Sequence, residues 1–397
     1  MTAHSSRLAV LFANLGHFIT HGVMLLYPTV VLTLGAEFHL GWGALMWLSV
    51  PGTVLYGLAA LPAGWLGDRW NAEWMMVLFF LGSGVGCVAT ALASSPAGIA
   101  VGLALTGLFG SIYHPVGTAW LVRNAVNRGR MLGWNGIFGQ AGVGAGPLAA
   151  GALATAFGWR AAFLVPGALC VACGLALMLL VRVGAVAATR TDRRPQPEPD
   201  RGDARRAFAL LSITMLCSGI VFQAMTSALP KLFADRLADV TGGGLVGTGG
   251  LVSLVFVVSS LFPLLGGYLA DRFSMKLVYV LAWAAEIPIL AAAIGLYSTP
   301  LLAVTMCAFC MQSIATPVEN SLLARYTPGR WRATAFGAKF VLSLGVSALG
   351  VPLVATVYDR TGGFSWLFVI LAALAAIAVA AGSFLPLDRA PALAPAE

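Results

Sequence analysis

Residues 111–130 read SIYHPVGTAWLVRNAVNRGR, and residues 313–332 read SIATPVENSLLARYTPGRWR. At a constant offset of 202 positions, the two stretches share Ser, Ile, Pro, Val, Leu and three Arg. A second pair repeats almost in register, with GWLGDRW at 64–70 and GYLADRF at 267–273. Self-similarity at a fixed long offset indicates that one structural unit has been duplicated. The chain is therefore predicted to consist of two halves with the same architecture.

The composition predicts that both halves lie in a membrane. Hydrophobic residues make up 59% of the 397-residue chain and charged residues only 10%, against about 25% charged residues in soluble domains. The mean hydropathy is +0.88. Since about 20 apolar residues cross a bilayer as a helix, twelve runs qualify. They are 8–34, 43–67, 74–93, 97–122, 131–157, 160–182, 208–234, 246–270, 276–296, 300–325, 332–358 and 364–386.

These runs predict an all-α integral membrane protein with twelve transmembrane helices in two pseudo-symmetric six-helix bundles. Residues 1–182 form the first bundle, and residues 208–397 form the second bundle with a short tail. Residues 183–207 between them are rich in Arg, Pro, Asp and Glu, which is typical of a poorly ordered cytoplasmic linker. The first run is too long for a signal peptide and is interpreted as a span.

The distribution of basic residues predicts the topology. With both termini in the cytoplasm, 18 of the 23 Lys and Arg residues lie on the cytoplasmic side. Arg160, Lys231, Arg236 and Arg360 lie on the other side, and Lys339 lies within a run. Loops with excess positive charge face the cytoplasm, so we expect a multi-pass protein of the inner (plasma) membrane. The net charge of +8 then faces anionic lipid, and no nucleic-acid partner is implied.

The six cysteines do not indicate a disulfide framework. Two CxxC spacings, at Cys170/Cys173 and Cys307/Cys310, fall inside apolar runs without His or carboxylate partners at ligand spacing. Buried cysteine commonly serves as a small apolar residue, and that is the interpretation adopted here. No metal or other cofactor is predicted.

Titratable residues lie unusually deep in the first and fourth runs. Asn14, His17 and His21 recur at positions i, i+3 and i+7, which share one helix face, and Tyr113 and His114 lie in run 97–122. Ionisable groups inside membrane spans mark transport pathways by default, and histidine exchanges a proton near neutral pH. Alternatively, each is a neutral imidazole bonded to a backbone carbonyl. Spacing along the chain does not show whether the three histidines converge on a metal ion.

A second polar face follows the tenth run, whose polar residues at helical spacing are Gln312, Thr316, Glu319 and Asn320. Lys339 lies at a similar depth in the adjacent run, so Glu319 and Lys339 can neutralise each other. Two interpretations remain open: a structural pair, or a pair in which Glu319 takes a proton and frees Lys339 for an anionic cargo. Glu286 in the ninth run is predicted to have a structural role facing the tenth run or a polar cleft. The remaining pathway candidates are Tyr27, Gln140 and Gln223.

Twelve runs in two repeats with GxLxDR turns resemble the major facilitator superfamily. The first cytoplasmic motif of that superfamily is roughly GxLaDrxGrkxxl, of which Gly64, Asp68 and Arg69 are present here and the later glycine and basic pair are missing. The resemblance covers the whole chain. It implies a central cavity lined mainly by the first, fourth, seventh and tenth spans, which include both polar faces.

The resemblance also implies a cytoplasmic gate. An Asp at the end of one helix can accept hydrogen bonds from the amides that begin another. Asp68 is therefore expected near the start of run 332–358, and Asp271 near the start of run 131–157. The expected counter-charges are Arg69, Arg123, Arg272 and Arg325. The alternative is a static cytoplasmic cap.

Two further resemblances suggest the direction of transport. Gly142-x3-Gly146-Pro147-x2-Ala150-Gly151 is similar to a motif of drug:proton antiporters, although Ala150 replaces a glycine. The His114-Pro115 pair, together with Gly16-His17, resembles efflux proteins of the fosmidomycin-resistance type. We therefore expect proton-coupled export of a small organic or drug-like compound by a monomer working through alternating access.

The main alternative is proton-symport uptake of a small organic anion or metabolite. A membrane enzyme is not expected, because neither an HExxH nor a GxSxG motif is present. A sensor would need a signalling domain, which the short linker and tails do not supply. ATP is not expected to be the direct energy source, because the sequence contains no Walker-type loop.

Overall fold

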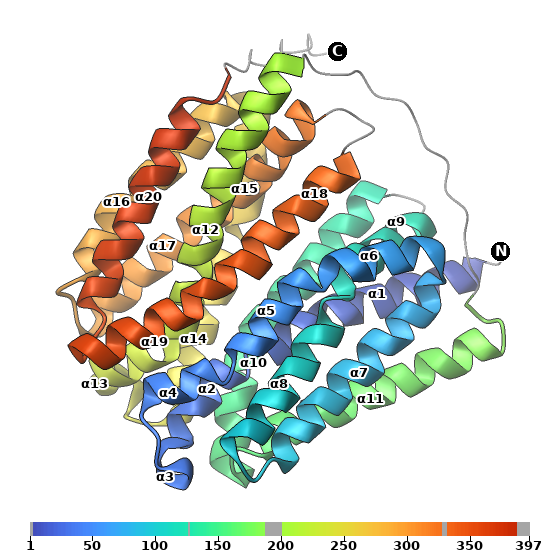
Figure 1. The fold of residues 1–397 in the computed structure, drawn as a ribbon, viewed down its shortest axis with the longest axis horizontal. Coiled ribbons are helices and arrows are strands. Elements are labelled where there is room, and N and C mark those ends of the chain that lie inside the picture. Colours follow the sequence, from blue (N-terminus) through green and yellow to red (C-terminus); the bar gives the residue numbers. More distant parts are fainter. Residues whose placement is uncertain (1–2, 126–127, 187–200, 328–331, 387–397) are drawn as a thin grey trace.

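The structure is a computed structural model that describes residues 3–125, 128–186, 201–327 and 332–386. Within these ranges, twelve helical segments are long and apolar enough to cross a membrane. Each corresponds to one of the twelve predicted runs, so the predicted all-α membrane architecture is confirmed. Figure 1 shows the helices of the first half, in blue to green, beside those of the second half, in yellow to red.

Short irregular turns divide several spans of the first half. Its elements are α1 (Ala3–Met24), α2 (Tyr27–Val30), η1 (Val31–Thr33), α3 (Gly35–Phe38), α4 (Trp42–Trp47), α5 (Val50–Leu58), α6 (Ala60–Arg69), α7 (Ala72–Leu92), α8 (Pro96–Gly110), η2 (Tyr113–Gly117), α9 (Thr118–Asn124), α10 (Arg128–Phe157) and α11 (Ala161–Arg182).

Within the described residues, the second half also contains six spans, but its π-helical turn lies in the fifth of them rather than the fourth. Its elements are α12 (Arg201–Arg236), α13 (Ala238–Thr241), α14 (Leu245–Ser259), α15 (Phe262–Arg272), α16 (Met275–Ala293), α17 (Ser298–Tyr326), α18 (Arg332–Phe340), η4 (Val341–Gly345), η5 (Val346–Leu349), α19 (Gly350–Thr361) and α20 (Ser365–Ser383).

The predicted linker requires a correction at its end. Helix α12 begins at Arg201, inside the range 183–207 that was predicted to be linker. Ala and Arg are strong helix formers, so the sequence ARRAF at 204–208 extends the seventh span as a helix rather than as linker. Residues 187–200 lie outside the described residues.

Equivalent residues cap the third span of each half. Asn71 follows the GWLGDRW motif, and its side-chain oxygen accepts a hydrogen bond from the Trp74 amide at 3.1 Å. Ser274 follows GYLADRF and accepts from the Leu277 amide at 3.2 Å. An oxygen at this position satisfies one of the amides that a helix start leaves unpaired. The repeated motif therefore also determines where the next helix begins.

The two halves use matching contacts between their second and fourth spans. A Cβ atom on Gly64 would lie 3.1 Å from Cβ of Pro115, and one on Gly266 would lie 3.0 Å from Cγ of Pro317. In both halves, a glycine of the second span thus packs against the proline of the fourth span. This local correspondence agrees with duplication of the chain.

Small residues of α10 bring the two halves together. A Cβ atom on Gly151 would approach the Leu245 carbonyl oxygen of α14 to 2.6 Å, and Gly249 of α14 lies equally tightly against Pro147. The Leu148 amide donates to the Ser253 hydroxyl at 3.1 Å. Small residues permit such backbone contact between membrane helices. The glycine-rich segment GVGAGPLAAG at 142–151 therefore serves close packing, and its partner on this face is α14.

Aromatic residues connect the halves at the end of the bundle that contains α3, α4 and α13 (Figure 1). Trp42 of the first half packs against Tyr358 and Phe364 of the second, with ring centroids 4.9 and 5.9 Å apart. Nearby, Glu37 accepts hydrogen bonds from Trp159 at 2.6 Å and Arg160 at 2.8 Å. These bonds lower the pKa of the Glu37 carboxyl below its usual value, the bond from Arg160 most of all.

The contact between α5 and α8 provides a direct test of the packing. A Cβ atom on Gly107 would overlap the carbonyl group of Gly52, whereas a Cβ atom on Gly267 would meet nothing within 4 Å. We expect Gly107→Val to destabilise the protein by about 1–3 kcal/mol through overpacking and to lower its melting temperature in detergent. Gly267→Ala is the control and should not lower it, so an equal loss in both variants would contradict the packing described.

Candidate functional site

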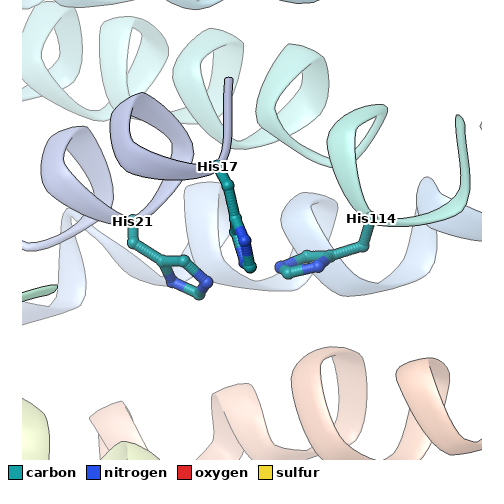
Figure 2. Close-up of side chains that lie close together, drawn as sticks. All are labelled: His17, His21 and His114. Carbon is teal, nitrogen blue, oxygen red and sulfur yellow. The ribbon is translucent and has the colours of Figure 1, made fainter. Parts of the chain in front are cut away.

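Three histidines from two spans converge in the first half (Figure 2). His17 and His21 lie on α1, and His114 lies on η2. The ring centroids of the three pairs are 5.0, 5.6 and 5.3 Å apart, and one ring nitrogen from each histidine lies within 4.8 Å of the others. We call these residues the histidine cluster. All three residues are half-buried.

His17 is oriented by two contacts outside the cluster. Its Nδ1 atom lies 2.7 Å from the backbone carbonyl oxygen of Asn135 on α10. Because a carbonyl only accepts, Nδ1 carries the hydrogen, and Nε2 of a neutral His17 is left with its lone pair. The ring also stacks on Tyr113 at 4.9 Å with an interplanar angle of 21°. The rotation and tautomer of this imidazole are therefore set by neighbours.

Tyr113 fits between two glycines. A Cβ atom on Gly16 would approach its ring to 2.9 Å, and one on Gly117 would approach it to 2.7 Å. The Tyr113 hydroxyl donates to the Ala13 carbonyl at 2.9 Å and accepts from Asn135 Nδ2 at 2.9 Å. Gly16 in the Gly-His pair thus allows the tyrosine to approach α1 closely enough for His17 to stack on it.

Asn135 is a site residue that the sequence analysis missed. Its side chain bonds to Tyr113 and to Asn14, at 3.0 Å to Asn14 Oδ1, while its backbone carbonyl holds His17. It is only 3% exposed. The available signal was its side-chain amide, one of two with Gln140 in an otherwise apolar and glycine-rich run, where an unpaired polar group is costly.

Pro115 explains the unusual backbone beneath the cluster. Residues Tyr113–Gly117 form a π-helical turn. Proline has no N–H to donate inside a helix, and the wider turn accommodates it. Such turns are rare and are frequently found at functional sites. Here the turn places Tyr113 and His114 so that both rings reach His17.

A second polar group lies in the other half. Lys339 Nζ of α18 lies 2.7 Å from Glu319 Oε1 of α17, and the two side chains are 9% and 6% exposed. Lys339 also donates to Asn320 Oδ1 at 2.5 Å. The predicted pairing of Glu319 with Lys339 is confirmed. We call this set, together with Tyr279, the ion-pair cluster.

Tyr279 of α16 was not predicted to belong to the site. Its hydroxyl donates to Glu319 Oε2 at 2.6 Å, and the side chain is fully buried. Both oxygens of the carboxylate are therefore occupied by donors from two different helices. Charge-assisted bonds of this kind are stronger than bonds between neutral groups.

Helix α18 links the two clusters. Phe340 follows Lys339 directly, and its ring stacks on His114 of the first half with centroids 5.5 Å apart and an interplanar angle of 21°. A shift of α18 that breaks the Lys339 ion pair would therefore also displace the ring that covers His114. The histidine cluster faces the second half at this point (Figure 2).

Glu286 and Gln312 form a separate buried pair. Gln312 Nε2 donates to Glu286 Oε1 at 2.6 Å, and the residues are 7% and 1% exposed. This contact confirms that Glu286 faces the tenth span. The side-chain amide of Gln312 is thus bonded to a partner on α16.

Within the part of the chain that the structure describes, three other predicted pathway residues form no hydrogen bond with either cluster. Tyr27 is 2% exposed, and its hydroxyl donates to the Leu45 carbonyl at 2.6 Å, which anchors α2 to α4. Gln223 donates to Ser227 on the same helix at 3.3 Å. Gln140 is half-buried on α10, next to Gly139, which packs against the His17 ring.

The predicted gate arginines show a repeated contact. Arg69 lies over the Trp65 ring at 4.3 Å, and Arg272 lies over the Tyr268 ring at 4.6 Å. In each GxLxDR motif, the arginine thus forms a cation–π contact with the aromatic residue one helical turn before it, and the two contacts occupy equivalent positions. The Asp68 side chain and residues 126–127 and 328–331 lie outside the described structure.

The other gate residues lie near the ends of their helices. Asp271 is exposed at the end of α15, and Arg325 is exposed near the end of α17. Arg123 donates from Nε to the Ala119 carbonyl at 3.4 Å on α9. Their predicted role in gating stays a prediction.

Comparison with known proteins identifies the family. The sequence profile of the Major Facilitator Superfamily matches residues 10–261 and 211–397, which together include almost the entire chain. The chain belongs to the major facilitator superfamily. This confirms the superfamily predicted from the repeated motifs and makes the protein a membrane transporter by family and fold.

Solved structures of other major facilitator transporters share the fold. A bacterial homolog of the human lysosomal transporter Spinster, in an inward-facing and unoccupied conformation, superposes with a TM-score of 0.72 at 16% identity over 97% of this chain and 95% of the other. A peptide transporter, POT, in complex with sulfate, gives 0.72 at 15% identity over 95% and 94%. FucP in an outward conformation gives 0.61 at 14% identity over 97% and 100%.

A curated relative in the superfamily is the tetracenomycin C resistance and export protein of Streptomyces glaucescens. It is 29% identical over 185 residues, which make up 46% of this chain and 32% of that protein. The aligned region therefore spans only about a third of the length of this relative.

The hydrogen bonds around Asn135 lead to a prediction about the first half of this transporter. Replacing Asn135 by Leu removes the bond to Asn14 and one of the two bonds of the Tyr113 hydroxyl, which keeps its bond to the Ala13 carbonyl. A buried polar group that loses its partner costs about 1–3 kcal/mol. We expect a lower melting temperature in detergent. Tyr113→Phe should cost less, and the double variant should lose less than the sum of the two single losses, because the residues share one bond. Strict additivity would show that this bond does not contribute.

Proposed function

We propose that this major facilitator transporter exports a small organic or drug-like compound in exchange for protons. The observation that carries the proposal is the ion-pair cluster, in which Glu319 and Lys339 lie nearly buried within adjacent spans. Charged residues at such depth are expensive and mark ion or substrate pathways. Glu319 is the group assigned to the coupling proton.

The chemistry of the cluster supports this assignment. When Glu319 is ionised, Lys339 and Tyr279 satisfy its two oxygens. Protonation of Glu319 removes the charge that holds Lys339, whose remaining contact in this cluster is Asn320. A lysine freed within the membrane needs a new anionic partner. Protonation of Glu319 thus changes how Lys339 is held, which is the kind of change that coupling to protons requires. A freed Lys339 that binds acidic cargo together with the proton would instead suit the symport alternative.

Two similarities favour export over uptake. The glycine-rich segment of α10 is similar to the motif of drug:proton antiporters, and the curated relative is a resistance and export protein. Proton-symport uptake of a small organic anion is the second candidate, because the lysine would serve an anion entering from either side. Localisation in the inner membrane with cytoplasmic termini follows from the positive charge of the predicted cytoplasmic segments.

Transport in everted membrane vesicles tests the coupling. The cargo is first chosen by comparing growth of cells with and without the gene across a panel of toxic organic compounds. We expect accumulation of that compound to follow an imposed proton gradient and to collapse when a protonophore is added. Dependence on sodium instead, or accumulation that is unaffected by either ion, would contradict proton coupling.

Substitutions in the ion pair separate a coupling role from a structural one. Removing one partner of a buried pair typically costs about 3–5 kcal/mol, whereas removing both can be nearly neutral. We therefore expect Glu319→Gln and Lys339→Met each to lower the melting temperature and the double variant to recover it. The double variant should nevertheless fail to concentrate cargo against a gradient.

The control for this experiment is Lys231→Met, which removes an ion pair with Asp235 that lies at 2.6 Å and is more exposed. We expect a small effect on stability and retained proton-driven transport, since exposed pairs contribute about 0–1 kcal/mol. Full proton-driven transport by the Glu319→Gln/Lys339→Met double variant would show that the pair is structural and would overturn the assignment of the coupling proton.

A further inference from the structure

The geometry points to a binding site for a divalent transition-metal ion formed by His17, His21 and His114. Three imidazoles from two spans offer one ring nitrogen each, and these nitrogens all lie within 4.8 Å of one another. Three protein nitrogens with one open position form the ligand set of many tetrahedral zinc sites. This inference is separate from the proton-coupling proposal, which depends on the ion-pair cluster.

To bind an ion, the three histidine nitrogens need to move only slightly closer together. A tetrahedral ion with metal–nitrogen bonds of 2.0–2.1 Å holds its ligands about 3.3 Å apart. The present maximum separation of 4.8 Å exceeds that value by roughly 1.5 Å. We infer that this contraction comes from rotation of the His21 and His114 side chains, which lie beside His17 (Figure 2), while the His17 ring stays where Asn135 and Tyr113 hold it.

His17 has the outer contact that a metal ligand requires. Ligating histidines usually donate their other ring N–H to a carbonyl or carboxylate, which fixes the tautomer. His17 Nδ1 lies 2.7 Å from the Asn135 carbonyl oxygen, so Nε2 is the nitrogen available to an ion. Gly139 lies directly against that side of the ring, where a Cβ atom would approach Nε2 to 2.6 Å. The His17 ring therefore fits against α10 only because residue 139 has no side chain.

The chemistry of the ligands defines the class of metal. Neutral imidazole suits Zn²⁺, Cu²⁺, Ni²⁺ and Co²⁺, whereas Mg²⁺ and Ca²⁺ prefer oxygen ligands. The three ligands belong to the first half, and Phe340 of the second half covers His114. The ion is therefore bound within one half and next to the interface, where its remaining coordination position can accept a donor atom from water or cargo.

Cobalt is the probe for the test, because tetrahedral Co²⁺ ions absorb strongly in the visible range. The full-length protein is purified in detergent with an affinity tag that contains no histidine and is then titrated with Co²⁺ alone. We expect one Co²⁺ per chain with a tetrahedral spectrum, displaced by Zn²⁺. His21→Gln and His114→Gln should each weaken binding at least tenfold. His39→Asn is the matched control, since His39 lies outside the cluster with a positive φ of 52° that Asn tolerates.

A second measurement does not depend on folding of the variants. X-ray absorption at the zinc edge of the Zn²⁺-loaded wild-type protein should show a first shell with three imidazole ligands. A lack of stoichiometric Co²⁺ binding by the wild type would overturn the proposal, as would binding unchanged in both cluster variants or a zinc shell without imidazole. Because no step measures transport, these outcomes are independent of whether protons drive export.

Discussion

Polar groups at membrane depth must find partners within the protein, and this constraint organises both halves of the transporter. Lipid offers no hydrogen bonds, so an unpaired group there costs several kcal/mol. Glu319 is satisfied by Lys339 and Tyr279, and the hydroxyl of Tyr113 is satisfied by Ala13 and Asn135. Each of these two sets of bonds thus connects three spans, which apolar side chains cannot do by hydrogen bonding.

Helix α10 shows how close packing makes such partnerships possible. One of its faces packs on α1, where a Cβ atom on Gly146 would lie 2.8 Å from the Gly22 carbonyl oxygen. Another face contacts α14 of the second half through Gly151. The same helix carries Asn135, which holds His17. Small residues therefore do more than permit tight packing, because they bring a polar residue of α10 within bonding distance of the histidine cluster and connect that region to the other half.

The sequence predicted the parts of this arrangement that repeat along the chain, and the charged groups whose burial in a membrane is costly. Twelve apolar runs give the spans, the duplicated motifs give the two halves, and a carboxylate and an ammonium at similar depth predict the pair Glu319 and Lys339. Asn135 and Tyr279 were missed because neither belongs to a polar stripe of several residues at helical spacing, and their partners are set by tertiary packing. The start of α12 was misplaced because its charged residues are typical of both linkers and exposed helices.

The link between the clusters depends on the order of two residues in α18. Lys339 forms its ion pair within the second half, while Phe340 reaches across to His114. The adjacent side chains of Lys339 and Phe340 thus contact different halves of the protein. Helix α18, which carries both, continues into a π-helical turn, Val341–Gly345. A π-helical turn also lies beneath His114. Turns of this kind are rare and are frequently found at functional sites. Under the proposed coupling, protonation of Glu319 would release Lys339, and Phe340 would carry the resulting change in α18 to the face of the first half.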